Sequence, residues 1–331
     1  MKKWVADTIA ADKKKALPVL SFPAIQKMGI TVAELINSSD KQAEAMKIIA
    51  DSFPTAASLS LMDLSLEAEA FGSTIRVSDD EVPTVIGSIV DDEESADALK
   101  IPAIGTGRTQ IYIDAVKKAK KLITDRPVIA GTIGPFSLAG RLLDVSEALV
   151  YCYDEPDMVH TVLDKCAEFL IGYMLEYKKA GADGICMAEP LAGLLSPDLA
   201  EEFSAQYVRK IVDAVQDDEF IIVYHNCGNT AVQTVETIDT NGAPVFHFGN
   251  AIDMADMMPH ISANNIAMGN VSPAGEFRNG TPESIYAATT EVLKKCSKFP
   301  NFVISSGCDI PPMSPWENIE SFFKAVADFY A

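Results

Sequence analysis

The sequence predicts an α/β fold, a TIM-type (β/α)8 barrel with an excursion after its second strand. Short apolar runs rich in Val and Ile recur along the chain, and longer amphipathic segments separate them. Most runs do not alternate apolar with polar residues, which is typical of strands covered on both faces. Eight runs are present, and eight parallel strands joined by helices close a barrel. We therefore expect residues 1–331 to form one barrel domain.

The expected strands cover residues 17–22, 57–64, 127–134, 183–190, 220–227, 243–249, 266–273 and 302–309. The expected helices lie at 41–53, 109–122, 156–179, 197–215, 230–238, 253–260, 282–296 and 315–329. Three of these helices begin with a hydroxyl residue before a proline, which predicts N-caps at Ser196, Thr281 and Ser314, the last in a capping box with Glu317. Residues 65–108 form the excursion, with a hairpin expected at 73–85 and an exposed acidic loop at 91–97.

An open doubly wound sheet is the alternative α/β architecture, and it would carry a glycine-rich phosphate loop after its first strand. The first expected strand is followed by SFPAIQKMG instead. The GTGR stretch at 105–108 does not complete the GxGxxG pattern, so we assign it to a turn. The barrel is therefore favoured.

The chain carries 27 Lys and Arg against 47 Asp and Glu, a net charge of −20. This charge disfavours nucleic acid and anionic membrane surfaces as partners. No window reaches the roughly 18 apolar residues of a membrane span, and the first residues lack a signal-peptide pattern. The six cysteines are dispersed rather than arranged as a disulfide framework. Together these features predict a cytoplasmic protein with reduced thiols.

Polar residues stand where the expected strands end, which is where barrels of this type build their active sites. They are Asp63 (second strand), Glu189 (fourth), His225 and Cys227 (fifth), His247 (sixth), Asn270 (seventh) and Cys308 (eighth).

His225 and Cys227 are two positions apart, so their side chains share one face of an extended strand. Cys308 lies at the same height on another strand and can converge on them. One imidazole and two thiolates suit zinc, and three protein ligands leave the open position of a catalytic site. The competing interpretation is that these are ordinary core residues, since isolated buried cysteines usually are.

An open zinc position predicts one of two chemistries. It can hold a substrate thiol as a nucleophilic thiolate, ready to attack an electrophilic carbon such as a methyl group. It can instead hold hydroxide for hydrolysis, for which Glu189 or Asp309 would serve as general base. The residues alone leave both open.

The HxC pair with a distant Cys, together with DLSLEAEAFG (63–72), GTIGPFSLAG (131–140) and MAEPLAG (187–193), resembles the uroporphyrinogen decarboxylase superfamily. The similarity is greatest to its methylcobamide:coenzyme M methyltransferase branch and extends over nearly the whole chain. The resemblance implies a TIM barrel and zinc on His225, Cys227 and Cys308. It also implies a corrinoid (cobamide) cofactor held by a separate corrinoid-binding protein, which delivers the methyl group.

The decarboxylase itself resembles the chain less well. Its arginine-rich amino-terminal segment, which binds substrate carboxylates, is replaced here by LSFPAIQKMGI, which has no arginine. Members of the methyltransferase branch can use an acidic residue beyond the sixth strand as a fourth zinc ligand. The matching stretch, FHFGNAIDM (246–254), has Gly249 and Asn250 there and Asp253 farther on, so His247 or a water is the expected substitute.

The resulting hypothesis is a methyltransferase in which a zinc-bound small thiol attacks the methyl group of a methyl-Co(III) corrinoid, giving a thioether and Co(I). Glu189 is expected to orient substrate or a ligand, and Asp63 and Asn270 to line the catalytic mouth. One alternative enzyme moves methyl from a methoxylated or methylamine donor to the corrinoid protein. A non-enzymatic alternative is a docking or activating factor for that protein.

Overall fold

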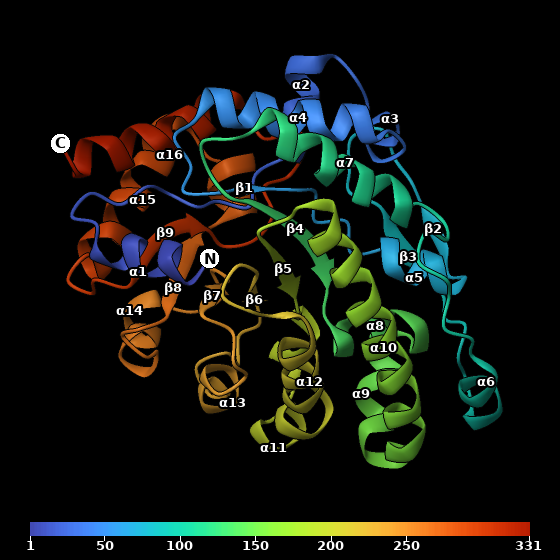
Figure 1. Cartoon of the computed structure of the whole chain (residues 1–331). Coiled ribbons are helices and arrows are strands. Elements are labelled where there is room, and N and C mark those ends of the chain that lie inside the picture. The colour runs from blue at the N-terminus through green and yellow to red at the C-terminus, as the bar shows by residue number, and fades with distance from the viewer.

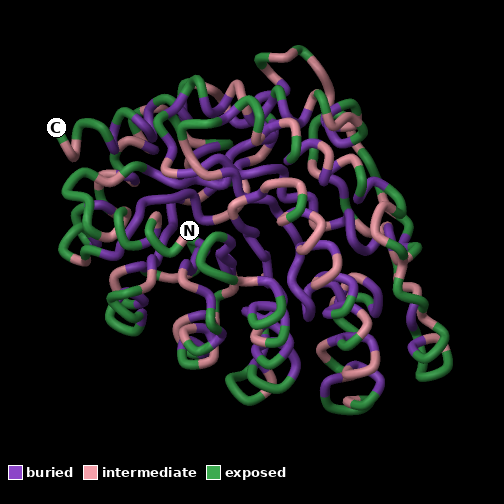
Figure 2. Tube along the Cα trace, viewed as in Figure 1, coloured by how far each residue is buried: buried purple, intermediate pink, exposed green.

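Seven parallel strands form one curved sheet in the computed structural model of the protein, which describes residues 1–331 (Figure 1). The strands are β1 (Ser58–Leu59), β4 (Val128–Ile133), β5 (Gly184–Ala188), β6 (Ile221–Asn226), β7 (Val245–Phe248), β8 (Ile266–Val271) and β9 (Phe302–Ser306). Their order in the sheet follows their order in the chain. Every residue of these strands is buried, which explains why the apolar runs do not alternate (Figure 2).

The strand expected over 17–22 does not form. The segment lies extended between β9 and β1 instead. Leu17 N donates to Ile304 O (3.0 Å) on β9, and Ala16 O accepts from Ala56 N (2.8 Å) just before β1. The segment therefore contacts both edges of the sheet without joining it as a regular ladder.

Local sequence explains why the first two expected strands are absent or short. Pro18 has no N–H to donate, so it interrupts a ladder at its second residue. The strand expected over 57–64 ends after Leu59, and the chain then turns at Asp63, whose carboxylate accepts from Ser65 N (3.1 Å). The other six expected strands are present within three residues of their expected ends.

Helices pack around the sheet (Figure 1). The longer ones are α4 (Ser39–Ser52), α7 (Thr109–Leu122), α8 (Pro135–Leu143), α9 (Val145–Asp154), α10 (Pro156–Ala180), α12 (Gln206–Val215), α15 (Pro282–Cys296) and α16 (Trp316–Phe329). The shorter ones are α1 (Lys2–Ala10), α2 (Ile25–Met28), α3 (Val32–Ile36), α11 (Pro197–Ala200), α13 (Val235–Asp239) and α14 (Met254–Met257). A single-turn π-helix (Glu201–Ala205) joins α11 to α12, so the helix expected over 197–215 is continuous but not α-helical throughout.

Two of the three expected N-caps are confirmed. Ser196 accepts from Leu199 N, and Thr281 forms a capping box. The cap expected at Ser314 is wrong, because α16 begins at Trp316 with Pro315 as its N-cap. Glu317 is then only the second residue of the helix, one position short of a capping box.

Residues between β1 and α7 form α5 (Leu66–Phe71), an antiparallel hairpin of β2 (Thr74–Arg76) and β3 (Thr84–Ile86), and α6 (Glu93–Ala98). The acidic loop expected at 91–97 is wrong in part, because Asp92 caps α6 and most of the segment is helical. Local capping chemistry thus outweighs the mutual repulsion of the carboxylates.

The amino ends of the strands are closed by α1. Val5 of this helix belongs to an apolar cluster with inward-facing strand residues such as Ile221 and Val223. Lys2 N donates to Asp218 O (2.9 Å), just before β6. The carboxyl ends of the strands therefore remain as the open edge for chemistry. None of the helices combines the length and apolar character that a bilayer span requires.

Candidate metal centre

His225, Cys227 and Cys308 come together at the carboxyl edge of the sheet. Their potential ligand atoms all lie within 4.8 Å of one another. His225 is in β6, Cys227 follows it, and Cys308 follows β9, three strands away in the sheet. In a flat sheet these strands would lie about 14 Å apart, so the curl of the sheet brings the three side chains together.

The donor set matches the chemistry of zinc. The Sγ atom of Cys308 lies 3.5 Å from Nε2 of His225, and the buried Nδ1 of His225 has no partner. An imidazole that presents Nε2 to a metal carries its proton on Nδ1. One imidazole and two thiolates are a common zinc set, and three ligands leave one coordination position for a substrate.

The two thiols of the cluster are electronically distinct. The hydrogen bond with Cys308 lowers the pKa of Cys227, and the same bond, with burial, raises the pKa of Cys308 to about 12. In the metal-free protein deprotonation of the pair therefore begins at Cys227, where the negative charge is favoured.

This asymmetry predicts the order of thiol alkylation. Cys227 and Cys308 are half-buried, whereas Cys152, Cys166, Cys186 and Cys296 are buried. We expect iodoacetamide to modify Cys227 first and Cys308 second in the metal-free folded protein, and zinc to protect both. Peptide mass spectrometry over a time course measures this. Faster labelling of the four buried cysteines would contradict the exposure that the structure assigns.

The backbone at Gly249 packs directly against Cys227 and limits the movement of this residue. A Cβ atom at Gly249, after β7, would lie only 2.5 Å from Cys227 Cβ, so no larger residue fits there without movement. The side-chain amide of Asn270 donates to the carbonyls of Gly249 and Ile252 (both 2.8 Å). Asn270 therefore holds the loop that packs against Cys227.

Glu189 is fully buried beside the metal cluster. Its carboxylate accepts from Phe136 N (2.9 Å) and Ser137 N (2.6 Å) at the start of α8, and from Ser204 Oγ (3.0 Å). Its own N–H donates to His225 O (2.8 Å). The residue thus joins α8 to the ligand-bearing strand, and burial raises the pKa of its carboxyl. With these bonds its carboxylate is poorly available as a general base.

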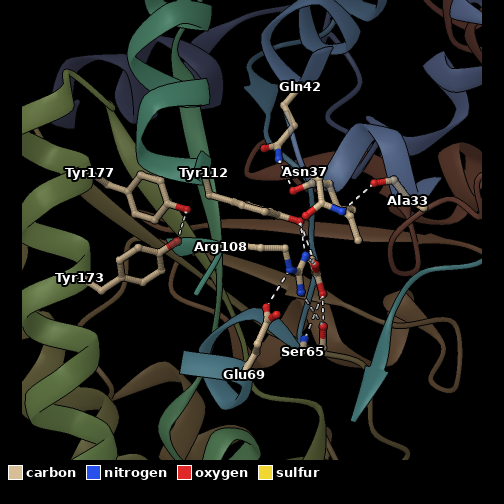
Figure 3. A network of polar contacts seen from close by, with 11 residues as sticks. Ala33, Asn37, Gln42, Ser65, Glu69, Arg108, Tyr112, Tyr173 and Tyr177 are labelled. Atoms are coloured by element: carbon tan, nitrogen blue, oxygen red, sulfur yellow. Dashed lines mark hydrogen bonds and ion pairs between the residues drawn. The ribbon is translucent and has the colours of Figure 1, made fainter. Parts of the chain in front are cut away.

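Asp63 lies in a buried ion-pair cluster. Arg108 contacts Asp63 through Nη1 and Glu69 through Nε (2.7 Å), and Tyr112 donates to Asp63 (2.8 Å). Figure 3 shows Arg108 between Glu69 and Ser65, with Tyr112 beside it. The carboxylate of Asp63 is therefore paired with side chains of the chain itself, and the side chain is 0% exposed.

Arg108 was missed by the sequence reasoning, which assigned GTGR to a turn. The turn is real, since Gly105 and Gly107 both have positive φ (101° and 59°), and its function is to deliver Arg108 to the start of α7. The sequence pattern that could have indicated Arg108 is two glycines just before an arginine at the start of a helix.

Glu67 is the second buried group that the sequence did not reveal. One carboxyl oxygen accepts from Ile133 N (3.2 Å) at the end of β4, and the other has no partner. Burial, with the nearby charge of Asp63, raises the pKa of Glu67 to about 8. The side chain is therefore mostly protonated at neutral pH.

The raised pKa of Glu67 predicts a pH dependence of stability. Because the pKa is higher in the folded than in the unfolded chain, the stabilisation is complete below about pH 4.5 and is lost as the pH rises towards 8. The free energy of unfolding of the wild-type chain should therefore fall relative to that of Glu67→Gln, by on the order of 4 kcal/mol at pH 8. Urea unfolding from pH 5 to 8 measures it, with the exposed Glu44→Gln as control. If the free energies of unfolding of the wild type and Glu67→Gln change equally with pH, the raised pKa of Glu67 is contradicted.

Neither His247, the expected substitute for a fourth ligand, nor Asp253 belongs to the three-residue cluster. His247 is buried with its Nε2 2.6 Å from Ser306 O. Asp253 caps α14 and pairs with Lys295 (3.1 Å), so its carboxylate is directed elsewhere. The chain itself brings three ligands together.

One histidine and two cysteines converge at the carboxyl edge of a parallel sheet covered by helices. This arrangement defines a candidate metalloenzyme. The family model for uroporphyrinogen decarboxylase (URO-D) matches residues 16–329. The chain therefore belongs to the uroporphyrinogen decarboxylase family, in its methyltransferase branch.

Individual relatives agree with this assignment. The methylcobamide:CoM methyltransferase MtbA of Methanosarcina mazei is 31% identical over 271 residues, covering 81% of this chain and 78% of that protein. Uroporphyrinogen decarboxylase of Coxiella burnetii is 26% identical over 290 residues, covering 84% and 78%. The solved structure of a methyltransferase from Methanosarcina mazei superimposes with a TM-score of 0.88 at 24% identity, over 100% of this chain and 99% of that one.

Proposed function

We propose that the chain is a zinc-dependent methyltransferase that moves a methyl group from a methylated corrinoid protein to a small thiol of the coenzyme M type. The observation that carries the proposal is the convergence of His225, Cys227 and Cys308 within 4.8 Å in a relative of MtbA. These three residues would hold the metal, which when bound supplies a Lewis acid that keeps a thiol in its reactive thiolate form.

The residues of the chain position the reactants. Glu189 fixes the strand that carries His225, and Asn270 fixes the loop behind Cys227. The half-buried Cys227 and Cys308 leave one side of the centre accessible from the mouth, where thiol and corrinoid can meet. Bringing two reactants together in this way accounts for much of the expected rate gain.

In this proposal the curved sheet is a closed (β/α)8 barrel, and residues 17–22 occupy its first strand position, between β9 and β1. Hydrogen bonds from this segment to both edges support the closure. Residues 65–108 are the excursion after the second position, and residues 1–331 form one cytoplasmic domain.

Decarboxylation is the natural alternative activity, because uroporphyrinogen decarboxylases are among the relatives. The segment LSFPAIQKMGI has no arginine for substrate carboxylates, and the buried Arg108 is already paired with Asp63 and Glu69. Both observations favour methyl transfer.

The direction of transfer is tested by two assays on the zinc-loaded protein. Methylcobalamin with a panel of small thiols should give thioether and Co(I), followed by absorbance and mass spectrometry. Cob(I)alamin with methoxylated or methylated amine donors should give no methylcobalamin. Activity in the second assay alone would reverse the direction of the proposal. If the chain were a docking factor, corrinoid-protein binding would persist in Cys227→Ala and neither assay would show turnover.

A further inference from the structure

Arg141 is a partly buried arginine without a partner in the chain. The arginines that are at least partly buried are Arg108, Arg126, Arg141 and Arg209. Three of them have ion pairs with acidic residues, whereas Arg141 has neither an ion pair nor a hydrogen bond. Burial lowers the pKa of its guanidinium, and no acidic group offsets this shift. The guanidinium has therefore lost part of its hydration without gaining a counter-charge.

The helix that carries Arg141 is otherwise enclosed. Every other residue of α8 is buried, from Pro135 to Leu143. The helices α5, α9 and α10 and the 3-10 helix Pro190–Leu194 pack around α8, which lies beside α10 in Figure 1. Arg141 therefore lies at the one position where the covering of α8 is incomplete.

The neighbours of Ser137 indicate which way Arg141 faces. Ser137 is four residues before Arg141 and shares its face of the helix. Ser137 N donates to the carboxylate of Glu189 (2.6 Å), and its hydroxyl accepts from Leu191 N (3.1 Å). Long side chains on a helix lean back over the preceding turn. The guanidinium of Arg141 is therefore directed towards the carboxyl edge of the sheet, where β5 ends.

This part of the edge adjoins the metal cluster. Glu189 N donates to His225 O (2.8 Å), so the residues that follow β5 lie directly beside the strand that carries a candidate ligand. The backbone of α8 packs closely on the same loop, since a Cβ atom at Gly140 would lie 2.3 Å from Leu191 Cδ1. An unpaired cation is therefore held on the element next to the candidate metal centre.

We propose that Arg141 binds an anionic group of one of the two reactants and thereby determines which reactants the enzyme accepts. A guanidinium pairs well with carboxylate, sulfonate or phosphate oxygens. The thiol can supply such a group as its acidic end, and the corrinoid can supply it as its phosphodiester. A single arginine matches one such group rather than the several carboxylates of a porphyrinogen. This inference rests on the proposed methyl transfer and adds a specificity-determining residue to it.

Two thiols of equal chain length test the thiol as the source of the anion. Mercaptoethanesulfonate is anionic and mercaptoethanol is neutral, and each is assayed with methylcobalamin and the zinc-loaded protein. Arg141→Met should lower kcat/KM for the anionic thiol roughly 10- to 100-fold, the usual effect of one charge-assisted hydrogen bond. It should leave kcat/KM for mercaptoethanol unchanged. Arg141→Lys keeps the charge and should recover part of the loss.

Two corrinoids test the other source, with mercaptoethanol as the thiol. Methylcobinamide lacks the phosphodiester of methylcobalamin. If Arg141 binds this group, Arg141→Met should raise KM for methylcobalamin and leave KM for methylcobinamide unchanged. Arg209→Met is the matched control, because it removes the same charge from a surface ion pair and should alter neither preference. A folded Arg141→Met with wild-type preferences in both pairs of reactants would overturn the proposal.

Protection from phenylglyoxal, which modifies unpaired arginines, tests binding without turnover. Peptide mass spectrometry follows the modification of Arg141 in the wild-type chain. Mercaptoethanesulfonate or methylcobalamin should slow it, whereas mercaptoethanol and methylcobinamide should not. The exposed Arg76 and Arg278 are internal controls and should react at unchanged rates. A rate at Arg141 that neither anionic reactant changes would contradict the assigned role.

Stability separates this role from a structural one. Arg141→Met should have a free energy of unfolding no lower than that of the wild type, because the lost charge has no partner in the chain. A loss of stability with unchanged reactant preferences would show a structural role instead. If the wild type methylates no thiol, the proposed function fails, and the labelling experiment decides the role of Arg141 alone. If Arg141→Met does not fold, Arg141→Lys and the labelling of the wild type decide it.

Discussion

Replacement of Cys308 by alanine is expected to abolish measurable thiol methylation while the protein remains folded. The substitution removes one of three ligands, so zinc affinity should fall by more than the roughly 10- to 100-fold typical of changes around a ligand. The large apolar core lies between the sheet and its helices and does not include Cys308. Thioether formation from methylcobalamin, measured with circular dichroism and thermal unfolding on the same sample, provides the test.

Cys296→Ala is the matched control for this substitution. Cys296 is buried at the end of α15, away from the three ligands, and its replacement should cost stability but not zinc binding. Full activity in Cys308→Ala would show that the site assignment is wrong. Unfolding of Cys308→Ala upon metal loss would show that the metal is structural.

Replacement of Arg108 by methionine is expected to lower the free energy of unfolding by about 3 kcal/mol or more. The change leaves the carboxylate of Asp63, whose side chain is 0% exposed, and that of Glu69 without their counter-charge. Removing one partner of a buried ion pair is costly because the remaining charge cannot be hydrated. Urea unfolding at pH 7 measures the change.

Arg209→Met is the matched control for Arg108→Met. Arg209 pairs with Glu201 on the surface of α12, and such pairs contribute less than about 1 kcal/mol. If the two substitutions destabilise the chain equally, the Asp63 cluster is not the buried ion pair that the structure describes.

The metal cluster could be predicted from sequence because it depends on two simple regularities. Residues two apart on a strand share a face, which pairs His225 with Cys227, and parallel strands end at one edge, which adds Cys308. Six of the eight expected strands are present near their expected bounds for a related reason, since buried parallel strands have continuous apolar sequences.

The partners of the other polar residues could not be predicted, because they come from distant parts of the chain. Arg108 lies 45 residues from Asp63, and Ser137 lies 52 residues from Glu189. No local pattern links such pairs, and only the packed fold places a helix start or a guanidinium beside a given carboxylate. The failed expectations at 17–22 and Ser314 have local causes instead, namely Pro18 and the one-residue shift of α16.

The most direct test of the account is the zinc content of the purified wild-type chain, determined by elemental analysis before and after treatment with a chelator. We expect one zinc per chain, loss of both zinc and thiol methylation after chelation, and recovery of both on adding zinc. We also expect Cys227→Ala to retain little zinc under the same conditions. A folded wild-type chain that methylates thiols without zinc, or that binds zinc equally well after loss of Cys227, would contradict these expectations.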